Sequence, residues 1–188
     1  MRLIMPSYNE PKEATVPDST LIYISLGGNI DPERHLPAAC SELSLQLDQP
    51  TISPIYQSPA VGMDGADFLN NVVGGHTCLA VEDVFSLLKD VEDAHGRIRL
   101  SNKFSDRTLD LDLLIFGDTI RQTTSRDADF SMTLPHPEIT EQAYVIQPLS
   151  DIAPDFKHPI SGLTFATICQ QMKTQSPAKF NVLNQIMV

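Results

Sequence analysis

The chain has 188 residues, of which 41% are hydrophobic and 20% are charged. This length fits one domain of ordinary size, which buries enough surface to fold without a disulfide or a structural metal. Thirteen Lys and Arg residues against 24 Asp and Glu residues give a formal net charge of −11. Such an acidic chain argues against nucleic acid or an anionic membrane as a partner, but it leaves room for a local basic pocket.

The cysteines and the apolar runs indicate the compartment. Cys40, Cys78 and Cys169 lie far apart, and no Cys or His spacing indicates a zinc site. No apolar run approaches the roughly 20 residues of a membrane-spanning helix. The N-terminal apolar run stops at Pro6, too early for the core of a signal peptide. We therefore expect a cytoplasmic protein with reduced thiols, and we expect a monomer.

The domain organisation follows from where periodic segments begin and end. Residues 1–19 contain proline and polar residues without periodicity and are predicted to form a flexible leader. A single domain is expected over residues 20–175. Residues 176–188 form a tail to which we assign no element.

The predicted elements alternate in a pattern typical of one fold class. In chain order they are a strand at 21–26, a helix at 31–47, strands at 51–58 and 68–79, a helix at 80–94 and a strand at 108–116. This βαββαβ order predicts a ferredoxin-like α+β fold, with an antiparallel sheet covered by helices in α-β-α layers. The remaining expectations are an exposed connection at 121–133, a short helix at 140–146, an irregular stretch with several prolines and a helix at 163–172.

Local signals support the two longer helices. Asp31 suits the N-cap of the first helix and Pro32 its first position. Apolar residues from Val81 to Val91 recur at the 3.6-residue spacing of an amphipathic helix. Gly96 then provides a glycine end to that helix.

The strand at 108–116 carries the most informative pattern. Side chains two residues apart on a strand point to one face, so Asp110 and Asp112 share a face opposite three leucines. Two carboxylates on one face repel each other, and Mg²⁺ held with substrate phosphates would offset that repulsion. The alternative is a half-exposed strand with an acidic wet face.

The loop before this strand is basic. It carries four of the thirteen basic residues, namely Arg97, Arg99, Lys103 and Arg107. Arginine forks grip phosphate oxygens while a metal neutralises them, so arginines beside two aspartates indicate a phosphate-and-magnesium site. A solvated charged loop is the alternative. No P-loop and no dinucleotide-binding motif occurs, so the pattern favours phosphoryl or diphosphoryl transfer without a Walker loop.

At this point several segments resemble a known family. The segment Arg107–Leu114, RTLDLDLL, resembles the signature of 6-hydroxymethyl-7,8-dihydropterin pyrophosphokinase, also called 2-amino-4-hydroxy-6-hydroxymethyldihydropteridine diphosphokinase. Further similar segments, in the family's order, are Ile24–Asn29, Ile55–Pro59, Asp67–Asn70, Glu92 with Gly96–Arg99, Leu134–Pro137 with Tyr144-Val145, and Pro148–Pro154.

The resemblance implies a reaction and a set of site residues. The family transfers the diphosphate of ATP to the hydroxymethyl group of the dihydropterin in folate biosynthesis, giving AMP. Asp110 and Asp112 would hold two Mg²⁺ ions and, with Arg97 and Arg107, would be the catalytic residues. The ATP-binding residues would be Glu92, Arg97, Arg99, Arg107 and His136. The pterin-binding residues would be Ser58, Pro59, Phe68, Asn70, Phe104 and Tyr144.

The chain departs from the family pattern at two places. Ser105-Asp106 replaces the usual Gly-Pro before the signature arginine, which puts a negative charge beside the ATP phosphates. Gln142 replaces an arginine expected six residues after His136. These departures leave open a paralogue that binds a pterin or nucleotide with weakened or no turnover, and a diphosphotransferase for another flat heterocyclic alcohol. Without the resemblance, Asn70 would be a turn residue, and Phe68 and Tyr144 would be core.

Overall fold

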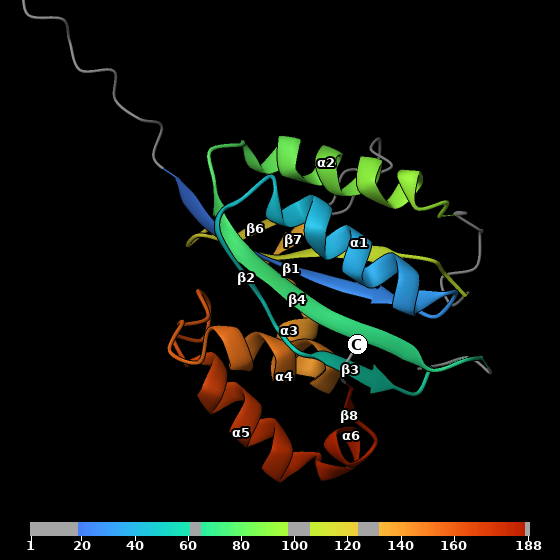
Figure 1. Ribbon diagram of the computed structural model, residues 1–188. Helices are drawn as coiled ribbons and strands as arrows, with labels where there is room; N and C mark the ends of the chain where they lie inside the picture. The colour runs from blue at the N-terminus through green and yellow to red at the C-terminus, as the bar shows by residue number, and fades with distance from the viewer. Residues whose placement is uncertain (1–18, 61–64, 98–105, 124–131, 187–188) are drawn as a thin grey trace, which may run out of the picture.

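A six-stranded antiparallel sheet forms the middle layer of the fold (Figure 1). The computed structural model describes residues 19–60, 65–97, 106–123 and 132–186. The strands of the sheet are β1 (Thr20–Gly28), β2 (Asp48–Ile52), β3 (Ile55–Ser58), β4 (Phe68–Thr77), β5 (Asp110–Phe116) and β8 (Asn184–Ile186). Their order is β5-β1-β4-β3-β8, and β2 pairs with β4 beside β3.

Helices cover both faces of this sheet (Figure 1). On one face lie α1 (Pro32–Ser44) and α2 (Val81–Ala94), and on the other lie α3 (Glu138–Glu141), α4 (Ala143–Ile152), α5 (Phe165–Gln175) and α6 (Pro177–Asn181). Each face has its own core, with Leu36 and Leu88 buried in the first and Val145 and Phe165 in the second. The layers and the antiparallel sheet confirm the predicted ferredoxin-like α+β fold.

The alternation in β5 holds as predicted. Leu109, Leu111 and Leu113 are buried in the core beneath α1 and α2. Asp110 and Asp112 are therefore directed to the opposite face of the sheet, the face that α3 and α4 cover. The sheet thus places both carboxylates where one group can contact them together.

Several predicted boundaries are wrong, each for a local reason. The predicted strand at 51–58 is interrupted, because Pro54 has no N–H for the ladder and Ser53 Oγ instead accepts a hydrogen bond from the N–H of Val72 at 2.9 Å. The exposed connection at 121–133 contains β6 (Arg121–Thr123) and β7 (Met132–Leu134), which pair with each other.

The C-terminal part is more regular than its prolines suggested. The helix predicted at 140–146 is two helices, α3 and α4, and α4 continues through Pro148 to Ile152 because its apolar side is buried against the sheet. The tail contains α6 and β8, and β8 pairs with β3. The predicted leader lies outside the described residues apart from Ser19, which precedes β1. No helix in the described ranges is long and apolar enough to cross a membrane.

Gly28 sets how closely β1 approaches the segment that precedes β5. A Cβ on Gly28 would lie 2.5 Å from the backbone carbonyl oxygen of Thr108, closer than a van der Waals contact allows. We expect Gly28→Ala to lower the free energy of unfolding by about 2–3 kcal/mol, because backbone and not a flexible side chain must move. Urea denaturation measures this difference.

The matched control is Gly162→Ala. Nothing lies within 4 Å of a Cβ at Gly162, but its φ of 68° is unfavourable for alanine. That change is expected to cost about 1 kcal/mol from backbone strain alone. A cost at Gly28 no larger than the cost at Gly162 would contradict the close approach.

Candidate active site

Gly27 of β1 lies between Asp110 of β5 and Asn70 of β4. It is the register partner of both residues. Directly opposed residues of antiparallel strands project to the same face, so the side chains of Asp110 and Asn70 share one face. With strands about 4.8 Å apart, the two Cα atoms lie about 10 Å from each other. A Cβ on Gly27 would lie 3.1 Å from Asn70 Oδ1, so the glycine leaves the surface between them open.

Two arginines neutralise Asp110. Arg97 Nη1 contacts Asp110 Oδ1, and Arg107 Nη1 contacts Asp110 Oδ2, so each carboxylate oxygen has a cationic partner. The three side chains are only 20–22% exposed, which limits screening by water. The sequence predicted that positive charge must offset the aspartates, and the geometry shows two of the predicted arginines doing so.

Glu92 holds Arg97 in place. The Glu92 side chain is 8% exposed, and its Oε1 both pairs with Arg97 Nη1 and accepts a hydrogen bond from the N–H of Leu111 at 2.8 Å. Because β5 is an edge strand, every second N–H points away from β1 and needs a partner from elsewhere. Glu92 therefore joins α2 to β5 and supports Arg97. Its predicted contact with ATP stays a prediction.

Asp112 is a carboxylate with a strongly raised pKa. Burial, and next the negative charge of Asp110, raise the pKa of Asp112 from the ordinary 3.8 to about 7, although Arg97 and Arg107 act in the opposite direction. A cation arriving beside Asp112 would relieve the cost of its charge. Such a raised pKa is expected of a carboxylate in a site suited to a metal ion.

Residues that follow β7 complete the acidic end of the site. The N–H of His136 donates to the carbonyl of Leu114 at 2.9 Å, which holds this segment against β5. Burial lowers the pKa of His136, and its Nδ1 is buried with no hydrogen-bond partner in the described part of the chain. Burial and then Asp112 raise the pKa of Glu138. Burial and then the negative charge of Glu138 raise the pKa of Tyr144.

Glu138 is a residue that sequence reasoning missed. It lies two positions after His136 in a segment that was recognised only by its prolines and histidine. Glu138 interacts electrostatically with Asp110 and Asp112, but it lies 26 or more positions away from them along the chain. No short-range sequence pattern therefore connects the three acids. The available signal was its place directly after the recognised Pro-His-Pro run.

The predicted pterin residues gather on the β3–β4 side. Asn70 Nδ2 donates to Ser58 Oγ at 3.0 Å, and both residues are buried. Phe68 is the register partner of Ser58, and the guanidinium carbon of Arg107 lies 5.9 Å from the centre of the Phe68 ring. The predicted ATP and pterin residues are thus in contact through Arg107 and Phe68. Pro59 follows Ser58 and is exposed.

The remaining predicted positions divide into two groups. Arg99 and Phe104, together with Lys103, lie outside the described residues. Ser105, the first residue of the Ser105-Asp106 departure, also lies outside the described residues, whereas Asp106 and Gln142 are described. Asp106 Oδ1 accepts a hydrogen bond from Asn29 Nδ2 at 2.6 Å. Gln142 lies between α3 and α4, where its N–H donates to the carbonyl of Glu138 at 2.9 Å.

The aspartate pair suits magnesium held jointly with a substrate. Carboxylate oxygens are the donors that Mg²⁺ prefers, and it is commonly bound by one or two carboxylates plus substrate phosphates. Within the described ranges no three His, Cys, Asp or Glu side chains converge as a metal site. Asp110 and Asp112 would provide part of a coordination sphere, which the oxygens of a phosphate group would complete.

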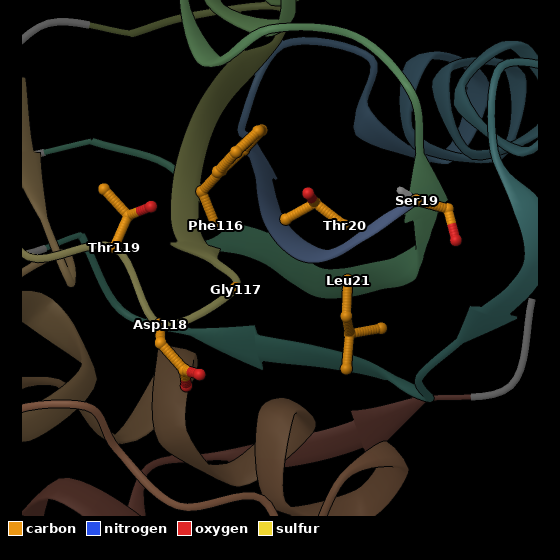
Figure 2. A pocket seen from close by; sticks show the side chains of 7 residues that line it. All are labelled: Ser19, Thr20, Leu21, Phe116, Gly117, Asp118 and Thr119. Carbon is orange, nitrogen blue, oxygen red and sulfur yellow. The ribbon is translucent and has the colours of Figure 1, made fainter. Parts of the chain in front are cut away.

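A pocket of about 450 Å³ lies elsewhere on the molecule. Figure 2 shows its lining, which comes from the start of β1 and the turn after β5: Ser19, Thr20, Leu21, Phe116, Gly117, Asp118 and Thr119. This is the opposite end of β5 from Asp110, so the pocket is separate from the candidate active site.

The fold is α+β with an antiparallel sheet, and its site has two aspartates beside two arginines. Proteins of this class are suited to binding a phosphate group together with a divalent metal. Comparison with known families makes this class specific. Residues 23–154 match the family model for 7,8-dihydro-6-hydroxymethylpterin-pyrophosphokinase (HPPK). The chain belongs to this family, as the resemblance predicted.

Individual relatives agree with the family match. A 2-amino-4-hydroxy-6-hydroxymethyldihydropteridine pyrophosphokinase of Synechocystis is 36% identical over 152 residues, which are 79% of this chain and 74% of the relative. A protein of the same name from Haemophilus influenzae is 35% identical over 146 residues, covering 75% of this chain and 86% of the relative.

A solved structure shows the same fold. It is the HPPK-DHPS protein of Plasmodium falciparum, with a TM-score of 0.72 and 12% sequence identity over 93% of this chain. The match covers 49% of that protein, so this chain spans about half its length. At this identity the likeness supports the fold alone.

Replacement of Glu92 tests its link between α2 and β5. We expect Glu92→Ala to lower the free energy of unfolding by about 2–4 kcal/mol, because Leu111 loses the acceptor of its N–H and Arg97 loses a partner in a poorly hydrated place. The control is Glu82→Ala on the same helix, whose exposed ion pair with Arg121 should contribute almost nothing. Equal effects of the two changes in urea denaturation would contradict the structural role of Glu92.

Replacement of Asp112 tests its raised pKa. Because the folded pKa of about 7 exceeds the ordinary 3.8, the carboxylate destabilises the fold fully above pH 7, and this effect fades as the pH falls from 7 toward 4. Metal-free Asp112→Asn should therefore be more stable than the native protein at pH 8, with a smaller gain at pH 5.5. Urea denaturation in EDTA measures both, with Asp118→Asn as the control. A gain independent of pH would contradict this assignment.

Proposed function

We propose that this protein transfers the β,γ-diphosphate of ATP to the hydroxymethyl group of 6-hydroxymethyl-7,8-dihydropterin, with magnesium, giving AMP and the pterin diphosphate for folate biosynthesis. The observation that carries the proposal is the register that places Asp110 and Asn70 on one face across Gly27. Membership of the HPPK family and the relatives' names support the same substrates.

Phosphate binding would fall to the two arginines. Arg97 and Arg107 both contact Asp110, and they would turn to the phosphate oxygens of ATP when the nucleotide enters. Asp110 and Asp112 would then hold Mg²⁺, which supplies neutralisation of the phosphate charge. Two ions are expected by analogy with the family, and His136, with its buried Nδ1 facing no partner in the described ranges, would be near the nucleotide.

Pterin recognition would depend on the orientation of the Asn70 amide. Since Asn70 Nδ2 donates to Ser58 Oγ, Oδ1 remains directed toward the space beside Gly27. An oxygen in that position can accept a hydrogen bond from an N–H of the pterin edge. Phe68 and Tyr144 would cover the faces of the ring, and a flat heterocycle between aromatic rings is held with little polar contact.

The chemical step makes modest demands on the protein. The hydroxymethyl group gives up its hydroxyl proton to water, and its oxygen forms a bond to the β-phosphorus. The bond from this phosphorus to the oxygen bridging to the α-phosphate breaks, and AMP leaves with that oxygen. Charge neutralisation and alignment therefore account for most of the rate enhancement. Gln142 is the observation that favours the second candidate, a binding protein with weak turnover, because a neutral side chain stands where the family usually has a cation.

One assay separates these functions. We expect purified protein with Mg·ATP and the dihydropterin to release AMP, and Asp112→Ala to lower kcat by at least about a thousandfold, because transition-state charge loses a metal ligand. Asp118→Ala, which removes an acid from the other end of β5, should leave the rate unchanged. Calorimetric titration with a non-hydrolysable ATP analogue and with pterin tests binding. Pterin binding without AMP release would establish the second candidate and reject the first.

A further inference from the structure

Asn29 joins three segments at the end of β1. Its Oδ1 accepts a hydrogen bond from the N–H of Arg107 at 2.8 Å, and its Nδ2 donates to Asp106 Oδ1 at 2.6 Å and to the carbonyl of Ala66 at 3.3 Å. Its own N–H donates to the carbonyl of Arg107 at 3.0 Å. Asn29 is buried, at 8% exposure. The segment before β5 and the loop before β4 are therefore both fixed to β1 through one side chain.

The chemistry of these partners determines which way the amide faces. A backbone N–H can only donate, so the atom beside Arg107 must be the oxygen. A carboxylate and a carbonyl can only accept, so the atom beside Asp106 and Ala66 must be the nitrogen. The amide cannot rotate by 180° without losing all three hydrogen bonds. Of the two acceptors, Asp106 is the closer one and carries the negative charge that strengthens the bond.

We propose that Asp106 is a positioning residue for Arg107, acting through Asn29. Its carboxylate fixes the Asn29 amide, and the amide oxygen then fixes the backbone of Arg107. From that backbone the side chain of Arg107 reaches Asp110 and lies over the Phe68 ring. Asp106 thus restricts this segment through a hydrogen bond. At the same place, the family's Gly-Pro pair would restrict the segment through the backbone itself.

This role is opposite in sign to the charge effect expected from the sequence. If Asp106 mainly repelled ATP phosphates, removal of its charge would tighten nucleotide binding. If it positions Arg107, removal of its oxygen would weaken nucleotide binding, because Arg107 would sample orientations that do not face the phosphates. Asp106→Asn and Asp106→Ala separate the two effects, since asparagine keeps an acceptor oxygen without the charge and alanine keeps neither.

Calorimetric titration with a non-hydrolysable ATP analogue and Mg²⁺ gives the first test, and it rests on the proposed function. We expect Asp106→Ala to weaken binding about three- to tenfold. Asp106→Asn should bind as the native protein does or tighter. Asp118→Ala controls for loss of one negative charge at a distance and should leave affinity unchanged. Equal or tighter binding by Asp106→Ala would overturn the positioning role.

A second test does not depend on nucleotide binding. Urea denaturation of Asn29→Ala, Asp106→Ala and the double variant forms a double-mutant cycle. We expect the double variant to lose less stability than the sum of the single losses, because both changes remove the same hydrogen bond. Additive losses would overturn the proposal even where the protein makes AMP. If the native protein neither bound the analogue nor made AMP, the proposed function would fail, and the cycle alone would decide the contact.

Discussion

Two carboxylates on one face of an edge strand are the constraint on which the candidate site depends. Asp110 and Asp112 repel each other, and among the described residues Arg97 and Arg107 form ion pairs with Asp110. Asp112 keeps a pKa raised to about 7, mainly because it is buried. Ionising Asp112 in the folded protein costs free energy, and functional sites often retain such a cost. A metal ion that binds together with phosphate would remove it. The contacts of Glu92 and Asn29 support the arginines, and Glu92 also binds the backbone of β5 between the two acids.

The second constraint is the register of the sheet. Asn70 and Asp110 come from strands that are separated in sequence by α2 and by the segment that follows it. They share a face only because β1 lies between β4 and β5 and because Gly27 is paired with both. A slip of one residue in either pairing would turn one side chain to the opposite face. Strand order and register therefore bring the predicted ATP side and pterin side together, and the contact of Arg107 with Phe68 joins them.

Features that depend on local pattern could be predicted from the sequence. The alternation of leucine and aspartate in β5, the periodic apolar residues of α2 and the glycine after its end all agree with the structure. Features that depend on distant partners could not. The pairing of β8 with β3 and of β6 with β7, and the continuation of α4 past Pro148, come from tertiary contacts that no short window contains. Likewise Asn29 and Asp106 are 77 positions apart.

The two departures from the family pattern differ once their partners are known. The presence of an acidic residue in the sequence does not determine the electrostatic potential at the ATP phosphates. The direction of its carboxylate and its distance from the phosphates both matter. Charges farther away than a Debye length of about 8 Å are largely screened at physiological salt. Asp106 is directed at an amide of the protein, and so a hydrogen bond accounts for its presence. Among the described residues, Gln142 forms hydrogen bonds through its backbone, at the junction of α3 and α4. We therefore expect the missing positive charge at Gln142, rather than Asp106, to be the departure that bears on turnover. The carboxylates of Glu138 and Asp112, which interact electrostatically, would add to its effect.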